Sequence, residues 1–229
     1  MRIGILKCGH FTGTLLETLG DVDAIFRAMF PNENFNFTTY DAEHLEFPTE
    51  TNEQEGWLIT GSKHGAYEDH AFIPPLEDFI RATAEERVPL VGICFGHQII
   101  AQALGGAVEK FEGGWSLGAT DYDYGSLGTA TLNAWHQDQV THAPATARTL
   151  ATGPNCKFAA LTYDAPILTF QAHPEFDPKV IETFVATRKS DPNYPPDRMQ
   201  TAAENTAKPL DNTRMRALIA DFLRGKAHV

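Results

Sequence analysis

Hydrophobic positions in the N-terminal half of the chain predict buried strands that alternate with amphipathic helices. Short apolar runs, typical of strands, occupy residues 2–6, 35–40, 56–60 and 89–93. Apolar residues at helical spacing cover residues 15–29, 74–87 and 94–104. This alternation predicts an α/β fold: a doubly wound, mostly parallel central sheet with helices on both faces.

The pattern changes after the glycine pair at residues 105–106. Short β-rich stretches follow one another without long helices between them, at residues 129–135, 147–151, 158–163 and 167–171. Strands in such close succession are typical of antiparallel pairing. We therefore expect an antiparallel strand region attached to the parallel sheet.

The C-terminal part returns to helical spacing at residues 178–189 and 213–223, with a proline-rich break at residues 191–196. The segment after this break has only about thirty residues, too few to bury a core of its own. We therefore expect residues 1–229 to form a single domain, with residues 191–229 as a C-terminal helical extension.

Composition and charge narrow the classes of partner. Apolar residues make up 42% of the chain and charged residues 21%, as in ordinary soluble globular proteins. The formal net charge of -12 disfavours binding to nucleic acid or to an anionic membrane surface. The N-terminal apolar run is too short for a signal peptide or a membrane span. We expect a cytoplasmic protein that acts on a small molecule, with no nucleic acid or membrane partner.

The cysteines predict neither a disulfide framework nor a metal centre. The chain has three cysteines, Cys8, Cys94 and Cys156. An odd number at wide spacing favours reduced thiols over disulfides. The chain has no C-x-x-C pair, and His10 beside Cys8 would supply only a second ligand. We therefore predict no metal site.

Cys94 lies where a buried strand passes into a helix, with Gly92 and Gly96 on either side. Small residues at these positions permit a sharp turn that presents the side chain at its tip, as in a nucleophile elbow. The positive end of the helix dipole would favour the thiolate there. The alternative is a core thiol, because free cysteines are often buried.

Two histidines could serve Cys94 as a base. His97 is one turn along the same helix, where reaching back to the thiol is difficult, so we expect a packed residue. His173 ends the apolar stretch 167–171, and Glu175 can accept a hydrogen bond from its ring. Ligand sites in open α/β sheets lie beyond the carboxyl ends of strands, so Gly61-Ser62, Cys94 and His173 should converge.

These residues together resemble a known family. The stretch G-I-C-F-G-H-Q at residues 92–98, the H-P-E at residues 173–175 and the glycine turn at Gly61 resemble the class I glutamine amidotransferases. The signature of that family is G-x-C-x-G-x-Q with a distant H-x-E, and the match covers residues 1–187. The resemblance implies a flavodoxin-like amidotransferase fold and a reaction that requires no cofactor.

The resemblance also implies roles for single residues in hydrolysis through a γ-glutamyl thioester. Cys94 would attack the γ-carboxamide of glutamine or of a γ-glutamyl amide. His173 would move the proton, and Glu175 would orient His173. The backbone N–H groups of Gly61 and Phe95 would stabilise the oxyanion.

Further positions are implied as substrate contacts. Gln98 would help to bind the γ-glutamyl group, and Ser62 belongs to the oxyanion turn. His136 lies in W-H-Q-D, which is similar to the family's W-H-x-D-x-V stretch, although a strand ending in a polar loop would read the same. Trp115 and Ser116 would meet the α-amino and α-carboxylate groups through their backbone.

The oxyanion turn reads T-G-S-K rather than the S-G-G-P common in synthetase-linked relatives. It is similar to the free-standing, GMP-synthase-like branch that includes γ-glutamyl peptidases. The first alternative is a glutaminase subunit that delivers ammonia to a separate synthetase. The second alternative is a non-catalytic binding protein with the same fold. The third is a cysteine-elbow protein of the Parkinson-associated or intracellular-protease type, and His97 as the working base would favour it.

Overall fold

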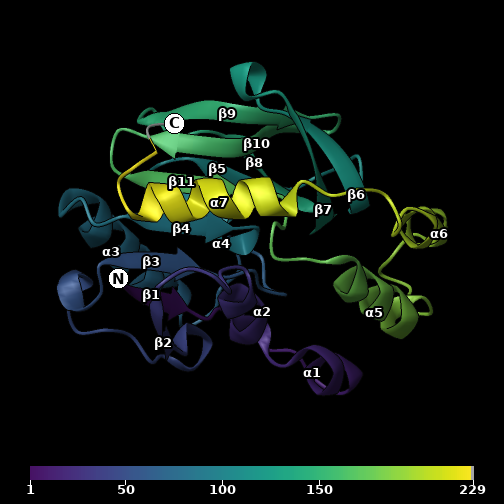
Figure 1. The fold of residues 1–229 in the computed structure, drawn as a ribbon, viewed down its shortest axis with the longest axis horizontal. Helices are drawn as coiled ribbons and strands as arrows, with labels where there is room; N and C mark the ends of the chain where they lie inside the picture. Colours follow the sequence, from purple (N-terminus) through teal and green to yellow (C-terminus); the bar gives the residue numbers. More distant parts are fainter. Residues whose placement is uncertain (228–229) are drawn as a thin grey trace.

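The computed structural model describes residues 1–227 and is built around a sheet of nine strands (Figure 1). Five neighbouring strands run parallel, in the order β2-β1-β3-β4-β11. Their bounds are β1 (Arg2–Leu6), β2 (Asn36–Tyr40), β3 (Gly56–Ile59), β4 (Leu90–Ile93) and β11 (Ile167–Phe170). The doubly wound parallel sheet predicted for the N-terminal half is confirmed.

The sheet continues beyond β11 with antiparallel strands, in the order β10-β9-β6-β7. Their bounds are β6 (Ser116–Asp123), β7 (Thr129–His136), β9 (Ala147–Gly153) and β10 (Cys156–Tyr163). Two more strands, β5 (Ala107–Lys110) and β8 (Asp138–His142), form a separate antiparallel pair. The added antiparallel region is thus present, although β5, β6 and β8 were not predicted from the sequence.

One strand was assigned to the wrong region. Residues 167–171 were expected among the antiparallel strands, but β11 pairs in parallel with β4 and antiparallel only with β10. All four residues of β11 are buried. A strand without a polar face fits the centre of a sheet covered on both sides, which is where the parallel strands lie.

The helices lie on both faces of the sheet, with α7 across one face over β4 and β11 (Figure 1). Neighbouring residues of a strand alternate between two apolar clusters: Leu58 belongs to one, whereas Trp57 and Ile59 belong to the other. Helices α2, α5 and α7 pack into the first cluster, and α3 and α4 into the second. The longer helices are α3 (Ile73–Glu85), α4 (Phe95–Ala103), α5 (Pro178–Arg188) and α7 (Asn212–Leu223).

The single helix predicted at residues 15–29 is two helices, α1 (Thr14–Leu19) and α2 (Val22–Ala28). Gly20 ends α1 with φ 75°, and the Asp21 side chain accepts a hydrogen bond from the N–H of Val22 at the start of α2. The apolar spacing continues through this break, so the pattern alone did not reveal it. Short 3₁₀ helices occupy Ala42–His44, Thr51–Glu53 and Gly125–Leu127.

The C-terminal segment contains a helix that the sequence did not predict, α6 (Pro196–Glu204). This helix is mostly polar and buries only Met199 and Ala202, which explains its weak pattern. Met199 and, on α7, Ile219 join the same apolar cluster as the sheet. We propose on this basis that the extension belongs to one domain with the rest; its residues 228–229 lie outside the described residues. None of the helices within residues 1–227 is long and apolar enough to cross a bilayer.

Gly96 allows helix α4 to lie directly against strand β3, and its replacement tests this packing. A Cβ atom at Gly96 would lie 2.4 Å from the carbonyl oxygen of Ile59. Glycine-to-alanine changes inside open helices normally stabilise by roughly 1 kcal/mol. Here we expect Gly96→Ala to lower the free energy of unfolding by about 1–3 kcal/mol, because the backbone of α4 or β3 must move to make room for the added methyl group.

Urea denaturation followed by circular dichroism measures this change. Glu85→Ala, on the exposed end of α3, is the control and should change the free energy of unfolding by less than about 0.5 kcal/mol. Gly96→Ala that is as stable as the parent would contradict the packing.

Candidate active site

The backbone turns sharply at Cys94, between the end of β4 and the start of α4. Cys94 has φ 53° and ψ -104°, a conformation that residues other than glycine rarely adopt. A Cβ atom at Gly92 would lie 2.5 Å from the carbonyl oxygen of Gly96, so the chain approaches itself closely here. The sharp turn predicted from the two glycines is therefore present, and strain of this kind is often found at functional sites.

His173 and Glu175 form a buried pair just after β11. The Nδ1 atom of His173 lies 2.6 Å from Oε1 of Glu175, and the side chains are only 5% and 1% exposed. The His173 ring also stacks on Phe176, with centroids 3.9 Å apart. These contacts fix the plane of the imidazole. Its Nε2 atom is buried without a hydrogen-bond partner.

Charges around His173 determine its protonation. Burial opposes the charged ring, but the negative charges of Glu175 and Cys94 outweigh it and raise the pKa of His173 to about 10. Burial, together with the charge of His173, lowers the pKa of His136 to about 3. At neutral pH the site therefore pairs a cationic His173 with a neutral His136.

Gly61, after β3, lies close to both Cys94 and His173. A Cβ atom at this position would be 3.5 Å from Cε1 of His173 and 3.9 Å from Cβ of Cys94. The ends of β3, β4 and β11 thus converge, as expected for the carboxyl edge of a parallel sheet. The N–H of Phe95 is the first in helix α4 and has no partner within that helix.

These residues share a cavity of about 310 Å³. Its walls include most of the positions singled out from the sequence: Gly61, Ser62, Cys94, Gln98, Trp115, His136, His173 and Glu175. Two others do not line it. The Phe95 side chain is buried in the core beside Phe72, which leaves only its backbone for a role in the site. Ser116 starts strand β6 opposite His136.

Comparison with known proteins gives the family. A family model described as glutamine amidotransferase class-I matches residues 29–189, more than half of the chain. The chain belongs to the class-I glutamine amidotransferase family. Sequence relatives include a glutamine amidotransferase-like protein of Schizosaccharomyces pombe, 29% identical over 72% of this chain and 71% of the relative.

Two further proteins match this chain along nearly its whole length. Gamma-glutamyl peptidase 2 of Arabidopsis thaliana is 24% identical over 92% of this chain and 90% of its own. A solved structure, the glutamine amidotransferase of Methylobacillus flagellatus, has a TM-score of 0.75 at 20% identity and covers 98% of this chain and 92% of its own. This structural likeness supports the fold alone.

His97, the second histidine of the cysteine motif, is a packed residue as expected. It is fully buried, and its Nδ1 atom lies 2.8 Å from Oγ1 of Thr169. Burial and the charge of His136 lower its pKa to about 3. It does not line the cavity, which argues against His97 as a base for Cys94.

Gln98 lines the cavity, but its amide nitrogen is already bonded within the protein. Nε2 donates to the carbonyl oxygen of Asp138 at 2.8 Å and to Oε1 of Gln171 at 3.2 Å. Gln171 in turn places its own Nε2 atom 3.7 Å from Sγ of Cys94. Sequence reasoning missed Gln171, because its complete burial beside Cys94 results from tertiary packing.

The proline-rich break also contributes to the cavity, which sequence reasoning did not anticipate. Tyr194 lies in this break and lines the cavity, and its ring centroid is 4.6 Å from that of Trp115 and 5.5 Å from that of Trp135. Arg188, at the end of α5, also lines the cavity. The break is therefore a wall of the site, not a simple linker.

The charge of Glu175 makes a measurable prediction for His173. Replacement Glu175→Gln keeps the shape of the side chain and removes the negative charge that favours the imidazolium. We expect the pKa of His173 to fall from about 10, because burial lowers this pKa and the negative charge of Glu175 no longer counteracts it. Titration of the imidazole resonances by NMR measures it.

Glu182→Gln, which removes an exposed carboxylate from α5, is the matched control and should leave the pKa of His173 unchanged. An equal pKa of His173 in Glu175→Gln and the parent would contradict the electrostatic role given to Glu175.

Proposed function

We propose that this amidotransferase is a free-standing hydrolase that cleaves the γ-carboxamide of glutamine or of a γ-glutamyl amide. Cys94 would be the nucleophile, His173 the acid and base, and Glu175 the residue that orients His173. The observation that carries the proposal is the buried His173–Glu175 pair beside the strained Cys94 turn. The Cys-His-Glu arrangement has the roles of a nucleophile, a base and an orienting group.

The reaction begins with attack of the Cys94 thiolate on the γ-carbonyl carbon. The carbon–sulfur bond forms, and the carbonyl oxygen becomes an oxyanion. Gly61 and Phe95 donate their backbone N–H groups to it, and each such donor contributes roughly 10²- to 10³-fold in rate. A cationic His173 beside the sulfur stabilises the thiolate before attack.

Collapse of the tetrahedral intermediate breaks the carbon–nitrogen bond. His173 gives its proton to the departing nitrogen, so that ammonia or an amine leaves and a γ-glutamyl thioester remains on Cys94. Neutral His173 then takes a proton from water, which attacks the thioester and releases glutamate. General acid–base catalysis of this kind contributes roughly 10²- to 10⁴-fold.

The substrate would lie in the shared cavity. We propose that Ser62, Gln98, Trp115 and His136 contact the γ-glutamyl part, and that Ser116 acts only through its backbone at the start of β6. The ring pair of Trp115 and Tyr194 borders the space left for the amine. No step of this reaction calls for a metal or an organic cofactor.

The alternative is a glutaminase subunit that delivers ammonia to a separate synthetase partner. The T-G-S-K turn at Gly61 favours the free-standing hydrolase, as does similarity to a γ-glutamyl peptidase along 90% of that protein. Both readings keep the same chemistry at Cys94. They differ in whether turnover requires a second protein.

The test is release of glutamate by the purified chain alone, with glutamine and a γ-glutamyl dipeptide as substrates. We expect turnover of the dipeptide without a partner, and we expect Cys94→Ala to lower kcat at least about 10³-fold, because the covalent path is lost. Glutamate is measured by an enzyme-coupled assay.

Cys156→Ala is the control, because Cys156 is a buried cysteine that does not line the cavity. It should retain kcat within a few-fold. Full turnover by Cys94→Ala would contradict the nucleophile, whereas glutamate release that requires an added synthetase would favour the subunit alternative.

A further inference from the structure

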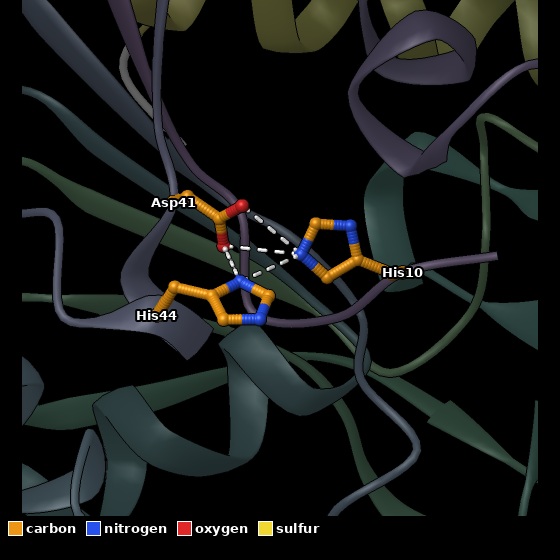
Figure 2. A group of neighbouring side chains, drawn as sticks. All are labelled: His10, Asp41 and His44. Carbon is orange, nitrogen blue, oxygen red and sulfur yellow. Dashed lines mark hydrogen bonds and ion pairs between the residues drawn. The ribbon is translucent and has the colours of Figure 1, made fainter.

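A second group of polar side chains gathers at the edge of the cavity, where β1 and β2 end. His10 follows β1, and Asp41 and His44 follow β2. Figure 2 shows the two rings and the carboxylate turned toward one another. His10 also lines the cavity that contains Cys94, so the group belongs to the cavity's edge.

Three atoms of this group form a nearly equilateral triangle. The Nε2 atom of His10 lies 3.1 Å from Oδ1 of Asp41 and 3.2 Å from Nδ1 of His44. The third side, from Nδ1 of His44 to Oδ1 of Asp41, is 3.1 Å. Ligand atoms around a tetrahedral zinc ion with bonds of about 2.0–2.1 Å lie roughly 3.3–3.4 Å apart. The triangle thus has nearly the size of one face of such a site.

The outer contacts aim His10 at this triangle. Its Nδ1 atom is 2.8 Å from Oδ2 of Asp21, and Asp21 itself accepts hydrogen bonds from the N–H groups of Phe11 and Val22. A proton on Nδ1 leaves Nε2 with a lone pair directed at Asp41 and His44. A carboxylate behind a histidine is the usual arrangement at metal-ligating imidazoles.

The charges around the group also favour a cation. Within residues 1–227, the carboxylates of Asp21, Asp41 and Glu43 pair with two ammonium groups, those of Lys7 and Lys63. The Nζ atom of Lys7 lies 3.3 Å from Oδ2 of Asp41, and Nε2 of His10 lies 3.0 Å from the same oxygen. The Oε2 atom of Glu43 is buried without a hydrogen-bond partner and lies 4.0 Å from Nε2 of His10.

We propose that His10, Asp41 and His44 bind a divalent cation of the zinc class, with Glu43 within reach as a fourth ligand. Two imidazole nitrogens with carboxylates suit Zn²⁺, Co²⁺ or Ni²⁺, whereas Mg²⁺ and Ca²⁺ prefer oxygen alone. The sequence did not predict this site, because Asp41 and His44 follow β2 and lie far from His10 along the chain. Only the pairing of β1 with β2 brings them together. The inference is independent of the hydrolytic role of Cys94.

A neighbouring group offers an internal comparison. His64, Glu68 and His70 also lie close together, but His64 directs its Nε2 atom to Glu43 at 2.9 Å, and its Nδ1 is 3.9 Å from Glu68. The sides of this second group are unequal, since Nε2 of His70 lies 2.8 Å from Oε2 of Glu68. His70 is therefore a suitable control: a histidine beside a carboxylate, outside the proposed site.

The experiment is calorimetric titration of Zn²⁺ into chelator-treated protein carrying Cys94→Ala, which removes the cavity thiol as a competing ligand. We expect one equivalent of Zn²⁺ to bind, with Mg²⁺ showing no binding at the same concentration. His44→Ala removes an exposed ligand and should weaken zinc binding at least about 10-fold, and Asp21→Asn about 10- to 100-fold. His70→Ala should bind as the parent does.

Co²⁺ provides a second readout, because its visible absorption is intense when four ligands surround it in a tetrahedron. We expect that absorption in the parent and in His70→Ala, and its loss in His44→Ala. Zinc binding that survives His44→Ala but is lost in His70→Ala would overturn the assignment. Absence of zinc binding in the parent would overturn it as well.

Discussion

The close contact between helix α4 and strands β3 and β4 is the constraint on which the rest of the site depends. Gly92 and Gly96 leave no room for a Cβ atom, so the chain passes from β4 into α4 within one residue. Cys94 is that residue, and it has a positive φ of 53°. The sheet on one side and the helix on the other keep the turn in place, because both are buried.

Electrostatics act within this fixed frame. Glu175 is almost completely buried, and the charge it carries is balanced most directly by His173. In the proposed reaction, the positively charged imidazole beside Cys94 would hold the proton that the leaving nitrogen takes. Neutral His136 on the same cavity adds no opposing charge. The proposed nucleophile and the proposed acid thus meet at one buried turn.

The sequence predicted the part of the fold that depends on simple periodicity. Strand β4, in which every residue is buried, and helix α4 were recognisable from their apolar patterns. Cys94 and His173 directly follow apolar stretches, so the sequence placed them at strand ends. Strand β6 was not recognisable, because Gly118, Asp121 and Asp123 interrupt its apolar pattern. The contacts of Gln171 and Tyr194 with the cavity depend on tertiary packing, which no local pattern records.

Trapping the covalent intermediate tests the central claim most directly, that Cys94 attacks the γ-carbonyl carbon. The protein is mixed with a γ-glutamyl amide, quenched in acid during turnover, digested, and analysed by mass spectrometry. We expect a γ-glutamyl group on the peptide that contains Cys94 and on neither of the peptides that contain Cys8 and Cys156. Turnover with the γ-glutamyl group on another residue would contradict it.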